Sequence, residues 1–318
     1  MRLLRIYAGT GREAIGMWLD CAIIGGGPAG LNAALVLGRS RRVVILFDNN
    51  RPRNAVTRHS HGFITRDGIE PREFRRLAHE NLASYPSVTV KPDRVVAITP
   101  GQPGFMLRTG NGVIYRSRTV ILAAGLKETL PQVPGISGYY GKSLFSCPYC
   151  DGWELRDKPL AVISESAHAF HSAKIIYNWS KDILVCTNGA NSLGADQIRQ
   201  LARKGIRVNP KRIQALVGEN GMLSRIAFAD GEEVRREGGF ISPLWEQGAA
   251  FGEALGCAMT QAGGFVTDDY GRTSVNGIYA AGDSSLIAPS QLVIAAGEGS
   301  KAAIGVNTDL TNQDFYMA

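Results

Sequence analysis

The sequence predicts an α/β fold of two Rossmann-like, three-layer nucleotide-binding domains, the second inserted into the first. A glycine-rich turn between two apolar strands lies near residue 25, and a second strand–helix–strand pattern runs from about residue 158 to 209. A late strand near residue 280 ends in another Gly-Asp turn. The length of 318 residues is also close to that at which one core divides into two. We place the first domain in residues 1–130 and 241–318, and the inserted domain in residues 131–240.

Composition excludes several classes of protein. The chain is 44% hydrophobic and 20% charged, and it has no apolar run of 18 residues, so we expect no membrane span. Residues 1–16 are basic but lack the apolar core of a secretory signal, and we treat them as a possible extension before Met17. The net charge of +7 is scattered, without the aromatic-interleaved basic runs that would indicate nucleic-acid binding.

Five cysteines are too few and too unevenly spaced for a secreted disulfide scaffold. Only Cys147 and Cys150 are close in sequence. In the cytoplasm, where we expect this protein, such a pair is typically catalytic or metal-binding.

The stretch "LDCAIIGGGPAGLNAALVLGRSRRVVILFD", residues 19–48, predicts a strand, a glycine turn, a helix and a second strand. Gly25 allows the tight turn, Gly27 lets the backbone approach a pyrophosphate, and Gly30 lets the helix pack on the strand. Pro28 and Ala29 begin the helix, whose N-terminal N–H groups can bind phosphate. Asp48 ends the second strand at the spacing expected for a ribose-binding acid.

The stretch "VNGIYAAGDSSLIAPSQL", residues 275–292, predicts a strand that ends at Asp283 and a helix that starts near Gln291. Together with "TVILAAG" at 119–125, it resembles the two-dinucleotide-binding flavoproteins. That resemblance implies FAD as the cofactor. The residues it implies at the FAD site are Gly25, Gly27, Pro28, Ala29, Gly30, Asp48, Asn54, Ala124, Gly125, Gly282, Asp283, Gln291 and Leu292. Asp283 could also serve as a helix cap.

The motif "CPYCDG", residues 147–152, could be a redox pair, part of a zinc site or two inert cysteines. Zinc would need a second ligand pair, and the sequence offers none, so we expect no metal site. With the flavoprotein motifs around it, the stretch resembles the low-molecular-weight thioredoxin reductases. The resemblance implies that Cys150 faces the flavin, that Cys147 exchanges with an outside dithiol or disulfide, and that Asp151 moves protons.

The inserted domain departs from that family where NADPH should bind. The strand "KPLAVI" is followed by Ser164, Glu165 and Ser166 in place of a glycine turn. Serine side chains obstruct the approach of a pyrophosphate, and the carboxylate repels it. The next strand ends in Thr187-Asn188-Gly189, without the basic cluster that grips a 2′-phosphate. We therefore predict a chain similar to the family members that lack the NADPH-binding motif.

The electron partner stays open. The resemblance implies a thioredoxin-like protein or a small dithiol as substrate, a ferredoxin as a candidate donor, and a homodimer. An alternative is a dithiol oxidase that passes electrons to oxygen, and a third is an idle flavin-binding protein with an interaction role. The aromatic residues Phe315 and Tyr316 could cover the flavin or the disulfide, and Tyr149 and Trp153 could line a substrate surface.

Overall fold

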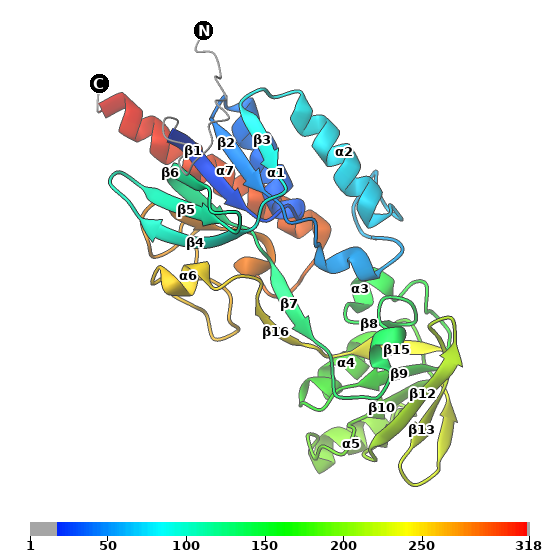
Figure 1. The fold of residues 1–318 in the computed structure, drawn as a ribbon. Helices are drawn as coiled ribbons and strands as arrows, with labels where there is room; N and C mark the ends of the chain where they lie inside the picture. Colours follow the sequence, from blue (N-terminus) through cyan, green and yellow to red (C-terminus); the bar gives the residue numbers. More distant parts are fainter. Residues whose placement is uncertain (1–17, 317–318) are drawn as a thin grey trace.

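The structure is a computed structural model that describes residues 18–316. The chain forms two lobes, each built on its own sheet (Figure 1). The first domain contains a seven-stranded sheet in the order β3-β2-β1-β6-β5-β4, with β17 paired to β6. Its strands are β1 (Trp18–Ile24), β2 (Val44–Phe47), β3 (Val88–Lys91), β4 (Val95–Pro100), β5 (Phe105–Thr109), β6 (Ile114–Leu122) and β17 (Ile278–Ala280).

Five strands of this sheet, β3, β2, β1, β6 and β17, run parallel to one another. The helices α1 (Pro28–Arg39) and α7 (Leu292–Tyr316) lie side by side on one face, where small residues allow close packing. A methyl group on Gly299 would come within 2.0 Å of the carbonyl oxygen of Ala29. The remaining helices of the domain are α2 (Pro71–Ala83), α6 (Phe251–Ala254), η1 (Arg53–Val56) and η3 (Gly282–Ser284).

The inserted domain contains a five-stranded parallel sheet in the order β11-β10-β9-β15-β8. One face packs on helices α4 and α5, and the other on the antiparallel sheet β12-β13-β14. These elements are β8 (Leu144–Phe145), β9 (Leu160–Ile163), β10 (Ile183–Cys186), β11 (Arg207–Asn209), β12 (Ile213–Glu219), β13 (Met222–Phe228), β14 (Glu233–Arg235), β15 (Gly238–Ile241), η2 (Ile136–Gly138), α3 (Pro148–Asp151), α4 (His168–Ile176) and α5 (Ala195–Ala202). The fold class is therefore as predicted, with one Rossmann-like domain inserted into another.

The chain crosses between the domains twice, and the two crossings pair as an antiparallel ribbon. Its strands are β7 (Leu126–Thr129) and β16 (Leu244–Gln247). Glu128 lies opposite Trp245 in this ribbon. The ribbon joins the two lobes, and α3 lies at the boundary between them (Figure 1).

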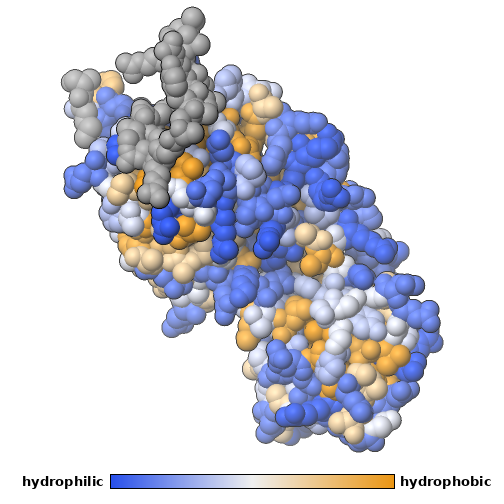
Figure 2. Space-filling model, viewed as in Figure 1, coloured by the Kyte–Doolittle hydropathy of each residue, from blue (hydrophilic) through white to orange (hydrophobic). Residues whose placement is uncertain are grey.

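The surface is mostly hydrophilic on the face drawn in Figure 2, with apolar residues interspersed over both lobes. Within residues 18–316, no helix has both the length and the apolar character needed to cross a membrane.

Candidate functional site

The turn between β1 and α1 has the geometry of a phosphate cradle. Gly25 adopts a φ of +113°, and a methyl group there would lie 2.2 Å from the carbonyl oxygen of Ala123. A methyl group on Gly30 would lie 1.9 Å from the carbonyl oxygen of Gly25, so only glycine lets α1 pack this closely. Gly27 caps α1 without a side chain and faces open space, and Pro28 occupies the first helical position. The N-terminal N–H groups of α1 are therefore available to an anion.

Asp48 lies beside this turn but already has a cationic neighbour. Its side chain is buried at the end of β2, next to Gly26. Arg75, from α2, donates a hydrogen bond to the carboxylate at 2.5 Å, and the backbone N–H of Asn50 donates another at 2.9 Å. The sequence did not indicate Arg75, because it lies 27 residues further along the chain.

The late Gly-Asp turn meets the first glycine turn. A methyl group on Gly282 would lie 2.8 Å from the Cβ of Ala29, and the N–H of Gly125 donates to the Ser284 hydroxyl at 3.0 Å. Asp283 accepts hydrogen bonds from Arg53 at 2.8 Å and from Ser290 at 2.9 Å. It does not cap α7, which begins nine residues later at Leu292.

Three other residues expected at the cofactor, Ala124, Asn54 and Gln291, lie next to other segments of the first domain. Ala124 lies against Gly25, and Asn54 lies in η1 beside Arg53. Gln291 directly precedes α7, and its amide nitrogen lies 3.8 Å from the position of a Cβ on Gly62. These contacts place Ala124, Gly125 and Gly282 at the β1–α1 turn or the late Gly-Asp turn, and Asp283 next to η1. The open cradle at Gly27 and the uncapped end of α1 fit a pyrophosphate-bearing dinucleotide such as FAD.

Cys147 and Cys150 form a disulfide with a Cα–Cα distance of 5.3 Å. Cys147 caps α3, and its carbonyl oxygen accepts the N–H groups of Cys150 and Asp151, each at 3.2 Å. Gly152 is required by packing, because a methyl group there would lie 2.8 Å from the Trp179 ring. Cys21, Cys186 and Cys257 are buried and unpaired with one another.

The Asp151 carboxyl group lies directly after the disulfide and is partly buried. Burial raises its pKa to about 7, and the neighbouring Glu154 carboxylate adds to the rise. Both protonation states are therefore populated near neutral pH. The group can give or take a proton as the adjacent sulfurs change state.

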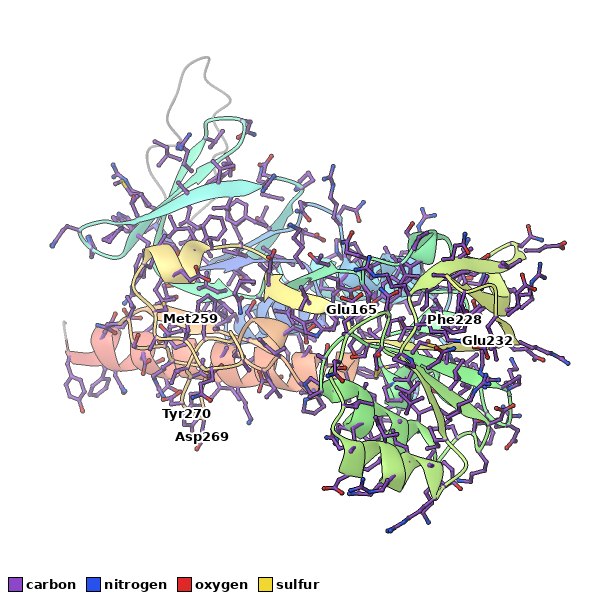
Figure 3. The ribbon with its side chains drawn as sticks, turned by 90° about the horizontal axis from the view of Figure 1, so that it is seen from below. Glu165, Phe228, Glu232, Met259, Asp269 and Tyr270 are labelled. Atoms are coloured by element: carbon purple, nitrogen blue, oxygen red, sulfur yellow. A yellow bond between two sulfur atoms is a disulfide. The ribbon has the colours of Figure 1, made fainter. Side chains whose placement is uncertain are left out.

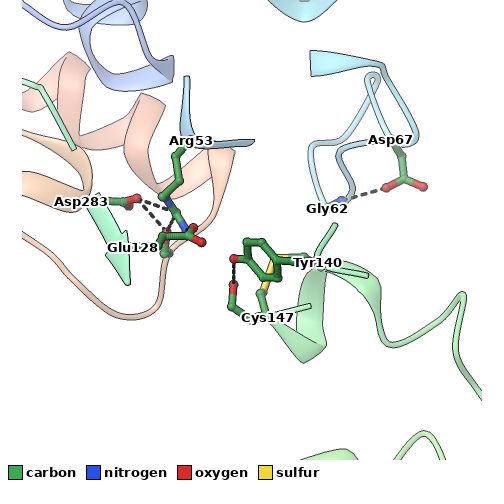
Figure 4. The surroundings of a disulfide bond; sticks show 10 residues. Arg53, Gly62, Asp67, Glu128, Tyr140, Cys147 and Asp283 are labelled. Atoms are coloured by element: carbon green, nitrogen blue, oxygen red, sulfur yellow. Dashed lines mark hydrogen bonds and ion pairs between the residues drawn. A yellow bond between two sulfur atoms is a disulfide. The ribbon is translucent and has the colours of Figure 1, made fainter. Parts of the chain in front are cut away.

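The disulfide lies at the contact between the two domains. Tyr140 donates a hydrogen bond to Ser146, the residue before Cys147, at 3.2 Å, and Figure 4 shows its ring beside the disulfide. Burial raises the pKa of Tyr140, and the Glu128 carboxylate of the ribbon raises it further. From the first domain, His61 reaches to within 3.6 Å of Glu154. Sequence reasoning missed Tyr140 and His61, which no motif marks.

Two large aromatic side chains lie exposed next to the disulfide. Tyr149 is 62% exposed and packs edge-on against Trp179, and Trp153 is 65% exposed with the Arg156 guanidinium over its ring. A contribution of these two rings to a substrate surface stays a prediction.

The turn after β9 has none of the openness of the first glycine turn. Ser164 is buried and lies 3.3 Å from the Ser166 hydroxyl, which also accepts the N–H of His168 at the start of α4. Glu165, labelled in Figure 3, accepts a hydrogen bond from the Asn188 amide at 2.6 Å. Hydroxyl and carboxylate groups thus occupy the turn where a second pyrophosphate would need backbone donors.

One basic side chain does reach the end of β10. The structure places Arg212, from the loop before β12, against Gly189. The sequence around Thr187-Asn188-Gly189 has no basic residue, and the guanidinium comes from 23 positions further along the chain. The prediction that this domain lacks a nicotinamide site therefore depends on the Ser164–Ser166 turn rather than on an absence of positive charge.

Phe315 and Tyr316 lie at the opposite end of α7 from Gln291. At a rise of about 1.5 Å per residue, a 25-residue helix places its two ends more than about 30 Å apart. Both rings are exposed and pack against each other. They do not cover the predicted flavin site or the disulfide of their own chain.

Comparison with known proteins identifies relatives over nearly the whole chain. Residues 19–299 match the family described as pyridine nucleotide-disulphide oxidoreductase. The thioredoxin reductase aclD of Aspergillus oryzae is 31% identical over 92% of this chain and 96% of its own. A putative thioredoxin reductase TrxB from Bacillus anthracis has a solved structure with a TM-score of 0.90 and 48% identity, covering 93% of this chain and 99% of its own. The structure of HlmI gives a TM-score of 0.89 at 34% identity, covering 94% of each chain.

These matches show an enzyme class as well as a fold, and their thioredoxin-reductase-like members share the architecture described above. The chain belongs to the pyridine nucleotide-disulphide oxidoreductase family.

Proposed function

We propose that the protein is an FAD-dependent dithiol–disulfide oxidoreductase that works without NAD(P)H. Cys147 and Cys150 exchange electrons between the flavin and a dithiol, either on a thioredoxin-like protein or on a small molecule. The observation that carries the proposal is the disulfide at the domain contact, followed directly by a carboxyl group with a pKa of about 7.

The cofactor assignment is supported by the β1–α1 turn, where Gly27 leaves the uncapped end of α1 open. Bound FAD would supply a two-electron, two-proton donor or acceptor for the cysteine pair. Independence from NAD(P)H is supported by the side chains of Ser164, Glu165 and Ser166 in the turn after β9. A ferredoxin as donor, a homodimer and a cytoplasmic setting remain parts of the proposal.

Dithiol oxidation proceeds by two successive thiol–disulfide exchanges. A substrate thiolate attacks Cys147, the bond between Cys147 and Cys150 breaks, and Cys150 leaves as a thiolate that Asp151 can protonate. The second substrate thiolate then attacks the mixed disulfide. Cys147 leaves as a thiolate, and the two substrate sulfurs are joined in a disulfide. The enzyme then holds two thiols at Cys147 and Cys150, and bound FAD would be the acceptor for their two electrons and two protons. In the direction of disulfide reduction, every step runs in reverse.

Anaerobic titration of the purified flavoprotein tests this proposal, with the flavin absorbance band as the signal. We expect stoichiometric NADPH to leave the band unchanged and a small dithiol or reduced thioredoxin to bleach it. Bleaching by stoichiometric NADPH would contradict the claim of independence. Re-oxidation of the dithiol-bleached flavin by air, with one oxygen consumed per turnover, would assign the oxidase direction, and bleaching by reduced ferredoxin would assign the reductase direction.

Cysteine variants test the role of the pair. Cys147→Ser and Cys150→Ser should each abolish bleaching by a dithiol. Cys257→Ser is the matched control, because Cys257 lies outside the pair and its contact with the Thr273 hydroxyl can be kept by serine. Full dithiol activity in both Cys147→Ser and Cys150→Ser would support an idle pair and overturn the proposal.

A further inference from the structure

Arg53 joins the predicted flavin site to the ribbon between the domains. Its guanidinium donates to the Asp283 carboxylate at 2.8 Å and to the Glu128 carboxylate at 3.0 Å (Figure 4). It also donates to the Ser290 hydroxyl at 2.6 Å and lies 5.1 Å from the centre of the Trp245 ring. Glu128 and Trp245 are cross-strand partners on β7 and β16, so one side chain contacts both strands of the ribbon.

The pairing is partly removed from water, which strengthens it. The Glu128 and Asp283 side chains are 11% and 16% exposed, and that of Arg53 is 29% exposed. A guanidinium presents several donors in a fixed fork, so it can satisfy two carboxylates at once. Replacing Glu128 by a neutral residue removes the charge-assisted hydrogen bond between Arg53 and β7, while the pair of Arg53 with Asp283 remains.

Two further contacts connect the same segment of the first domain to the inserted domain. Gly141 lies against the backbone of Val56, and a methyl group on it would come within 2.3 Å of the Val56 carbonyl oxygen. His61 lies 3.6 Å from the Glu154 carboxylate, three residues after Asp151. We call residues 53–61 the seat, because the ribbon, the loop before β8 and the segment after α3 all rest on it.

We infer that Arg53 is a positioning residue, and that through the seat it holds the inserted domain with its disulfide against the first domain. This inference rests on the proposed function, because an enzyme that needs no nicotinamide has its working orientation when the disulfide lies beside the flavin. Tyr140 lies near the same ribbon, because the Glu128 carboxylate raises its pKa, and its hydroxyl donates to Ser146, the residue before Cys147. Hydrogen bonds thus connect Asp283 through Arg53 to Glu128, and a separate one connects Tyr140 to the residue before Cys147.

Two pairs of matched variants test the inference in the flavin-loaded, full-length protein. Glu128→Gln removes a carboxylate that Arg53 contacts. Glu246→Gln removes one from the same ribbon whose one ion pair within residues 18–316 is with the exposed Lys127. Gly141→Ala forces a methyl group against Val56. Gly135→Ala is its control, because Gly135 has nearly the same φ, +78° against +77°, and has no atom within 4 Å of the added methyl. Backbone strain is therefore common to both glycine variants, and only the contact differs.

Hydrogen exchange of the seat, followed by mass spectrometry, is the first measurement. We expect Glu128→Gln and Gly141→Ala to raise amide exchange in residues 53–61 by about tenfold or more, as local opening becomes easier. The two control variants should exchange like the unchanged protein. This measurement needs no substrate, so it stands even if no dithiol proves to react.

The second measurement is the single-turnover rate of flavin bleaching by a dithiol. We expect the two test variants to bleach more slowly by about tenfold, because reacting groups that are less precisely positioned react more slowly. Their affinity for FAD should be unchanged. Equal exchange in test and control variants would overturn the inference. If neither a dithiol nor a reductant bleaches the flavin of the unchanged protein, the proposed function fails. The hydrogen-exchange data still decide the role of the seat in that case.

Discussion

The Asp151 carboxyl group lies in surroundings that disfavour its charge. Its pKa is raised to about 7 by burial and by Glu154, whereas in the unfolded chain it should titrate near 4. Between these two pH values the folded chain retains a proton that the unfolded chain has released. Asp151 therefore lowers the free energy of unfolding progressively as the pH rises from about 4 to about 7.

Replacing this carboxyl group should stabilise the oxidised protein only at pH values at which the carboxyl group is charged. We expect Asp151→Asn to raise the free energy of unfolding by on the order of 1–3 kcal/mol at pH 8, and to change it little at pH 4. Urea titrations at the two pH values measure the difference. Asp269→Asn, at an exposed acid of the first domain, is the control. An equal effect of Asp151→Asn at both pH values would contradict the assigned environment.

Single residues could be predicted where they form a pattern. The glycines, the cysteine pair and Asp151 were found because their spacing in the sequence is itself the signal. Arg53 and Arg75 could not be found this way, because their carboxylate partners lie 27 to 230 positions away. Arg212 illustrates the same limit, since the local sequence near Gly189 shows no positive charge and the fold supplies it.

The β1–α1 turn is an element whose glycines have different tasks. Gly30 is needed for packing, whereas Gly27 has an extended backbone that any residue can adopt and no atom within 4 Å of an added methyl. Only a ligand that approaches the helix end would meet a side chain at position 27.

We therefore expect Gly27→Ala to weaken FAD binding by about tenfold or more, because a methyl group would obstruct the pyrophosphate. The stability of the FAD-free protein should change by less than about 0.5 kcal/mol. Fluorescence titration with FAD and thermal melts of the FAD-free protein measure the two effects. Gly30→Ala should lower the stability of both forms, which distinguishes a packing defect from a binding defect. Unchanged FAD affinity in Gly27→Ala would refute this location of the pyrophosphate.

Elements next to glycine motifs or made of apolar runs were predicted closely. The helix expected near Gln291 begins at Leu292, and the strand expected before Ser164 is β9. The sheet β12-β13-β14 was not predicted, because the buried residues of β12 and β13 do not alternate regularly with exposed ones and the segment carries no motif. The pairing of β16 with β7 was not predicted either, because it joins residues more than a hundred positions apart.

At the scale of the whole molecule, each domain has its own apolar core. Two clusters of buried residues lie in the inserted domain, one on each face of its sheet, and their members all fall between residues 130 and 241. Two others belong to the first domain alone. The predicted boundaries at 130/131 and 240/241 lie close to the ribbon, where few apolar residues connect the cores.

A fragment that spans residues 130–242 should therefore fold by itself. We expect it to unfold in a single cooperative transition and to retain a near-ultraviolet circular dichroism signal, since packed cores immobilise aromatic rings. Thermal melts followed by circular dichroism provide the measurement. A fragment with secondary structure but no cooperative transition would indicate that its core needs the first domain, and the proposed boundaries would then be wrong.

The ribbon has a consequence for how this molecule can be rebuilt. Thr129 and Leu244 face each other where the chain enters and leaves the inserted domain. Two antiparallel residues in this position can be joined by a two-residue turn such as Asn-Gly. The inserted domain can therefore be treated as an exchangeable unit. Its removal would leave β7 and β16 as an ordinary hairpin. Its replacement would attach a different redox domain to the same first domain.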